Sequence, residues 1–168
     1  MGVMLTSATL VRPARYIDVP RIVAILADMH ARSVYAGLCA FDDKEARSLV
    51  TRSIQRHGAI GVGGTAVFVA EQDGVVRGFI IGHLDRVYFV CHGLTASDLF
   101  FCVEPGSDPR CATRLLDAFM AWAKGIDAVV EIHMGATNAA GDPERAGKLL
   151  ERKGLERSGI IYDWRKEA

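Results

Sequence analysis

Asp98 is the side chain with the clearest potential for chemistry, because its carboxylate leads directly into the apolar run 99–103. Beside so apolar a segment the carboxylate would be partly desolvated. Desolvation raises the pKa of an acid toward a value that suits proton transfer. Glu104 and Glu131 are weaker candidates for the same role. The alternative is that Asp98 only flanks the strand at the surface.

A polar loop, 104–110, follows the apolar run and leads into a strongly amphipathic helix. A buried strand that passes through a tight loop into a helix leaves backbone N–H groups and the positive end of the helix dipole pointing out of the loop. This arrangement favours an anion such as a phosphate. The stretch 96–124 therefore predicts an anion site at the start of the helix.

The elements that position these groups follow from hydrophobic spacing. Apolar residues at helical spacing predict helices that begin at Asp18, Asp42 and Asp142, besides the helix after the loop. Asp73 and Gly74 between two β-rich runs predict a hairpin. Strands are expected at 10–14, 65–71, 75–84, 99–103, 128–134 and 160–164. The predicted fold class is α/β, one domain over 1–168 with a mixed sheet in the order β-α-α-β-β-β-α-β-α-β.

Composition narrows the range of partners. The 168 residues include 20 basic and 20 acidic side chains without a basic cluster, so we expect no nucleic-acid partner. No apolar run reaches the length that spans a bilayer, so we expect no membrane partner and a cytoplasmic location. The four cysteines lack metal-ligand spacing, which predicts reduced thiols and no metal site. Each cysteine is interpreted as a small buried apolar residue, and Cys111, at the junction of loop and helix, is the one candidate for an accessible thiol.

The order of elements resembles the GNAT family of acyltransferases over nearly the whole chain, 10–164. Three strings add to the resemblance: 11–14 before the first helix, 68–78 across the hairpin, and 146–155 through the last helix into its turn. The likeness is closest to small members from bacterial and phage genomes. It implies acetyl-CoA as acyl donor, with the pantetheine along the strand at Phe101, Cys102 and Val103.

The family's pyrophosphate motif, Gln/Arg-x-x-Gly-x-Gly/Ala, aligns here with 107–112. Ala112 fits the motif, whereas Ser107 replaces Gln/Arg and Arg110 replaces the central glycine that lets the diphosphate approach the backbone. Either the Arg110 guanidinium holds phosphate directly, or the loop has lost the cofactor. Asp108 would place negative charge near the diphosphate. The residues that the resemblance assigns to the cofactor, besides the strand, are Asp108, Pro109, Arg110, Cys111, Ala112, Thr113 and Asn138.

The resemblance also suggests catalytic roles. Asp98 matches a position where the histone-acetyltransferase branch has a glutamate that deprotonates lysine, and a backbone N–H of the strand would stabilise the oxyanion. Many members carry a tyrosine acid in the last helix, where this chain has Leu150. Tyr162 on the expected final strand is the remaining candidate acid. His133 is interpreted as a solvated or otherwise satisfied histidine.

Two hypotheses follow. The first is an N-acetyltransferase that joins an acetyl group to a small-molecule or protein amine by direct attack on the thioester. In the family, the acceptor is recognised by segments that here contain Tyr35 and Tyr88. No acidic cluster in the sequence indicates a polyamine as the acceptor. The second hypothesis is a catalytically degenerate module of the same fold that binds a partner or forms a homodimer.

Overall fold

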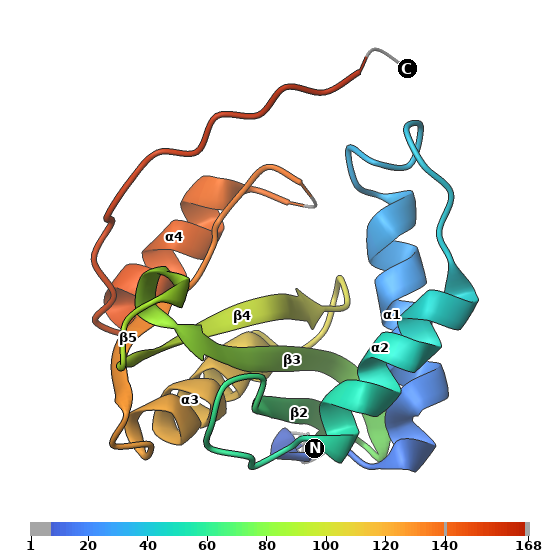
Figure 1. Cartoon of the computed structure of the whole chain (residues 1–168). Coiled ribbons are helices and arrows are strands. Elements are labelled where there is room, and N and C mark those ends of the chain that lie inside the picture. Colours follow the sequence, from blue (N-terminus) through green and yellow to red (C-terminus); the bar gives the residue numbers. More distant parts are fainter. Residues whose placement is uncertain (1–7, 140, 167–168) are drawn as a thin grey trace.

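The computed structural model describes residues 8–139 and 141–166. Within these residues one sheet runs in the order β1-β2-β3-β4-β5 (Figure 1). The first three pairings are antiparallel, and β4 and β5 are parallel. The strands are β1 (Leu10–Pro13), β2 (Thr65–Gln72), β3 (Val75–Arg86), β4 (Leu94–Val103) and β5 (Val129–His133). The mixed sheet expected from the sequence is therefore confirmed.

The hairpin between β2 and β3 forms where Asp-Gly predicted it. Asp73 and Gly74 both have positive φ, 51° and 76°. Two successive left-handed residues are what a type I′ turn requires, and that turn matches the twist of the two strands. The hairpin fixes the register of β2 against β3.

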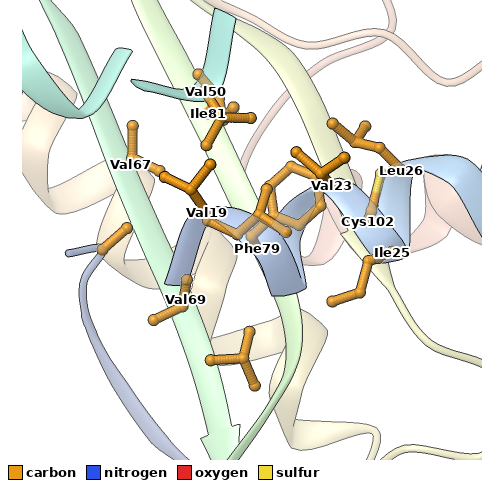
Figure 2. Close-up of a cluster of buried hydrophobic side chains, with 13 residues drawn as sticks. Val19, Val23, Ile25, Leu26, Val50, Val67, Val69, Phe79, Ile81 and Cys102 are labelled. Carbon is orange, nitrogen blue, oxygen red and sulfur yellow. The ribbon is translucent and has the colours of Figure 1, made fainter. Parts of the chain in front are cut away.

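Helices α1 (Val19–Ala31) and α2 (Asp43–Gln55) cover one face of the sheet. Figure 2 shows Val23 and Leu26 of α1 beside Phe79 of β3 and Cys102 of β4, and Val50 of α2 beside Ile81 of β3. The Asp42 carboxylate accepts a hydrogen bond from the Glu45 N–H and caps α2 as predicted. Asp18 precedes α1 but its side chain bonds elsewhere, to Arg12 and to the Arg15 N–H.

Helices α3 (Arg110–Lys124) and α4 (Pro143–Arg152) lie on the opposite face. Leu115, Leu116 and Phe119 of α3 are fully buried against β3 and β4. The helix approaches β3 so closely at Gly82 that a Cβ there would meet the Phe119 ring at 2.5 Å. Cys111 is also fully buried at this start of α3, so it does not provide the accessible thiol for which it was the candidate.

The predicted strand at 160–164 does not form in the described part of the chain. Its residues are extended, and Tyr162 is 89% exposed. Its β-rich composition produced the prediction, but a strand also needs a neighbour to pair with. The segment instead runs past α4 toward the loop between α1 and α2 (Figure 1), where the Arg165 guanidinium lies 5.7 Å from the Tyr35 ring. No helix within the described residues has the length and apolar character to cross a membrane.

Candidate functional site

The pairing of β4 with β5, the strand at the edge of the sheet, ends partway along β4. They pair from Leu94 with Val129 to Ser97 with His133, and β5 ends there. Beyond this point the β5-facing edge of β4, residues 98–103, has no strand partner among the described residues, while its other edge stays paired to β3. An open edge of this kind offers backbone N–H and C=O groups to an extended ligand.

A bulge in β4 lies at the point where this pairing ends. Gly82 pairs with Asp98 and Ile81 with Phe100, so Leu99 is the extra residue. A bulge redirects the side chains around it. As a result Ser97 before the bulge and Phe100 after it both lie on the face covered by α1 and α2.

Asp98 is half-buried at this bulge, and its carboxylate accepts a hydrogen bond from the Gly135 N–H at 3.1 Å. Burial raises the pKa of Asp98 above its ordinary value, and the Gly135 bond and the nearby His133 and His83 oppose that rise. The structure therefore contradicts the alternative in which Asp98 only flanks the strand at the surface. A partly desolvated carboxylate beside two imidazoles can accept a proton from a bound ligand.

A polar hollow of about 780 Å³ lies on the α1–α2 face of the sheet, beyond the part that these helices cover. Asp98 is not one of its lining residues, but two of them, His83 and His133, are the imidazoles that oppose the rise in the pKa of Asp98. Its floor comes from three strands, each of which contributes two polar side chains spaced two residues apart. These side chains are His83, Asp85, Thr95, Ser97, Glu131 and His133. Tyr88 and Phe89 of the 3-10 turn η2 (Val87–Phe89) also line the hollow.

The Asp108 side chain is bonded to Arg110, the first residue of α3. Asp108 accepts hydrogen bonds from the Arg110 backbone N–H at 2.8 Å and from the Arg110 guanidinium at 2.6 Å. These bonds lower the pKa of Asp108 to about 2, so this side chain is charged at neutral pH. Pro109 is the residue before the helix, and Ala112 and Thr113 are half-buried in its first turn. The Asp108 carboxylate therefore lies at the helix start where the sequence predicts an anion site.

The sequence-predicted residues fall into separate groups. Phe101, Cys102 and Val103 lie on the open half of β4, and residues 108–113 begin α3 directly after it. Asn138 lies in the loop before α4 and accepts a hydrogen bond from Arg165 at 3.4 Å. Arg165 also lies over Tyr35, so Tyr35 and Asn138 lie near each other, whereas Tyr88 lines the hollow.

Sequence reasoning missed the floor of the hollow. Asp85, Thr95 and Ser97 were not singled out, and His83 was not considered. The sequence feature that could have revealed them is a pair of polar residues two positions apart at the end of an otherwise apolar strand. This spacing places both side chains on the same face of the sheet. Only the register across the three strands shows that the polar pairs of β3, β4 and β5 lie side by side.

Comparison with known proteins gives the fold class. No family model and no curated protein matches the sequence. Solved acetyltransferases match the structure with probability 1.00. AAC(6′)-Iy, solved with the bisubstrate analog CoA-S-monomethyl-acetylneamine, matches with a TM-score of 0.70 at 16% identity, over 96% of this chain and 100% of that chain.

Two further acetyltransferases match along nearly their full lengths. Glucosamine-6-phosphate N-acetyltransferase from Arabidopsis thaliana has a TM-score of 0.68 at 11% identity, covering 95% of this chain and 99% of its own. Ribosomal-protein-alanine N-acetyltransferase from Brucella melitensis biovar Abortus 2308 has a TM-score of 0.66 at 18% identity, covering 95% and 100%. The chain has the GNAT acetyltransferase fold, as the resemblance predicted.

Proposed function

We propose that the protein is an acetyl-CoA-dependent N-acetyltransferase that acts on an amine by direct attack. The observation that carries the proposal is the open edge of β4, which has Asp98 at one end and the start of α3 just beyond the other. A thioester cofactor is long and ends in a diphosphate. It therefore needs an extended backbone edge followed by a helix start, in that order.

The cofactor's arm would lie along Phe101, Cys102 and Val103, and its diphosphate would bind at the α3 N-terminus. Arg110 is positioned to pair with that diphosphate, because its guanidinium already binds an anionic group there. Asp108 must then give up its bond to the Arg110 N–H, so cofactor binding competes with the native cap. That AAC(6′)-Iy was solved with CoA supports this choice of acyl donor.

The chemistry assigned to this site needs few side chains. Asp98 accepts the proton of the acceptor ammonium, and the freed nitrogen attacks the thioester carbonyl carbon. That attack forms the carbon–nitrogen bond, and a backbone N–H of 101–103 stabilises the resulting oxyanion. Collapse of the oxyanion re-forms the carbonyl and breaks the carbon–sulfur bond, and the second proton of the nitrogen passes to the departing thiolate through solvent. Tyr162 is too exposed here to serve as a fixed acid. We therefore propose that the sulfur leaves as a thiolate, which a thiol pKa of about 8.5 permits.

The competing candidate is a catalytically degenerate module, favoured by Asp108 at the helix start and by Leu150 where many members have a tyrosine. Isothermal titration with acetyl-CoA separates the two. The transferase proposal predicts one-to-one binding with a Kd between about 1 µM and 1 mM, the range of typical KM values. It also predicts thiol release in the presence of an amine. Absence of both heat and a thermal shift at millimolar acetyl-CoA would leave only the module.

A further inference from the structure

The floor of the polar hollow is organised in rows across the sheet. Ser97 is the Cα partner of both His83 and His133, and Thr95 is the Cα partner of both Asp85 and Glu131. The row with two histidines adjoins Asp98, and the row with two carboxylates lies two residues further along the strands. At about 3.3 Å per strand residue, the two rows are about 6–7 Å apart.

The second row can hold a cation. Asp85 and Glu131 flank Thr95 on the two neighbouring strands, about 10 Å apart at their Cα atoms given the usual strand spacing. The Thr95 hydroxyl donates a 3.0 Å hydrogen bond to the Glu131 carboxylate and fixes its position. Arg86 is the only Lys or Arg among the lining residues, so the two carboxylates outnumber it.

The far end of the hollow is aromatic. Tyr88 and Phe89 are 85% and 78% exposed, and both have positive φ, 51° and 62°. Such a backbone is unfavourable for bulky residues, and both side chains line the hollow. Aromatic faces attract ammonium groups and also pack against methylene chains.

We propose that the hollow binds the acceptor as a linear amine with two positively charged nitrogens. One nitrogen is presented to Asp98, and the other is held by Asp85 and Glu131. Asp98 lies three residues from Thr95 along β4, about 10 Å at their Cα atoms. The side chains of Asp98, Asp85 and Glu131 cover part of that span, and a chain of about four carbons between the two nitrogens covers the rest. The inference rests on the proposed function for its reaction, but on the cavity, the row spacing and the aromatic end for its choice of ligand.

The test compares two amines that differ only in the second charge. Putrescine and n-butylamine have the same four-carbon chain, and acetyl transfer from acetyl-CoA is followed by thiol release. We expect kcat/KM for putrescine to exceed that for n-butylamine by about tenfold or more. In Glu131→Gln and in Asp85→Asn that ratio falls toward one. Asp127→Asn, which removes an exposed carboxylate outside the hollow, keeps the wild-type ratio.

Equal kcat/KM for the two amines in the wild-type protein would overturn the inference while leaving the acetyltransferase proposal intact. A ratio unchanged in both hollow variants would overturn it as well. Titration of putrescine by ligand-observed NMR makes the test independent of turnover. Binding that is lost in Glu131→Gln and kept in Asp127→Asn supports the inference even if no acetyl group is transferred. Absence of such binding, with or without acetyl-CoA, contradicts it.

Discussion

The Asp108 carboxylate accepts a hydrogen bond from the backbone N–H of Arg110, the first residue of α3, at 2.8 Å. The side chain thereby satisfies one of the donors that a helix start leaves open. In the proposed complex this donor faces a diphosphate, so the cap and the cofactor are alternatives. In that complex Asp108 lowers the affinity for the cofactor, whereas Arg110 raises it.

Substitutions at these two positions should therefore change CoA affinity in opposite directions. Asp108→Asn keeps a side-chain oxygen for the Arg110 N–H but removes a negative charge, so CoA should bind about 3–10-fold more tightly. Arg110→Gln should weaken binding by a similar factor. Isothermal titration at low and high salt measures both, and the differences should shrink at high salt. A loss of affinity in Asp108→Asn would argue that Asp108 contacts the cofactor favourably.

Asp98→Asn should abolish most of the turnover. Removal of a general base typically costs about two to four decades in rate, whereas the cofactor edge at 101–103 is untouched. The measurement is kcat for thiol release together with Kd for CoA. The assignment of Asp98 as base fails if kcat stays within a few-fold of wild type.

The same substitution should stabilise the fold at neutral pH. Burial raises the pKa of Asp98 in the folded state above the unfolded value of 3.8, so the folded protein holds this proton to higher pH than the unfolded chain. Stability is therefore lost as pH rises through that window, because the charged form is disfavoured in the fold. Asn carries no such charge, and it can still accept the bond from Gly135. Thermal unfolding should give Asp98→Asn the higher Tm at pH 7, with the difference disappearing below about pH 4.

A buried ion network near the N-terminus should show the opposite pH dependence. The Arg12 guanidinium bonds to Asp18 at 2.7 Å and to Glu71 at 2.8 Å. Burial is the largest influence on Asp18 and raises its pKa, but hydrogen bonds from Arg12 and the Arg15 N–H outweigh it, so the pKa lies below 3.8. This contribution to stability is present above pH 3.8 and is lost as pH falls through the folded-state pKa.

Arg12→Met keeps an apolar stem but leaves the Asp18 carboxylate without its guanidinium. We expect a loss of about 1–3 kcal/mol in the free energy of unfolding at pH 7, measured by urea denaturation. The loss should be smaller near pH 3, where Asp18 begins to take up a proton. Arg47→Met is the matched control, because the Arg47–Asp43 pair is exposed and is worth under about 1 kcal/mol. Equal losses in the two variants would contradict a stabilising role for the network.

Most of the fold could be predicted because local signals agree with the tertiary arrangement. The cap at Asp42, the Asp73-Gly74 turn and the apolar face of α3 each dictate structure within a few residues of themselves. The strand at 160–164 was mispredicted because composition reports a tendency to extend, and not whether a partner strand is available. Burial of Cys111 also depends on packing that its neighbours in sequence do not reveal.

The candidate site was predictable in part for the same reason. The position of Asp98 beside an apolar run in the sequence predicts that its carboxylate is partly desolvated. In the structure this carboxylate is half-buried and its pKa is raised. The placement of Asp85 and Glu131 on either side of Thr95 depends on register over three strands and on the bulge at Leu99. The sequence alone therefore does not show that these two carboxylates line the same hollow.

Amide resonances are the most direct test of whether the open edge of β4 and the start of α3 form one cofactor site. In a titration with CoA followed by ¹⁵N-correlated NMR, we predict saturable shifts at Phe101, Cys102 and Val103 together with Arg110, Cys111 and Ala112. Both groups should report the same Kd, since one ligand contacts both. No shifts at millimolar CoA, or shifts that spare both groups, would contradict the proposed cofactor site and with it the acetyltransferase.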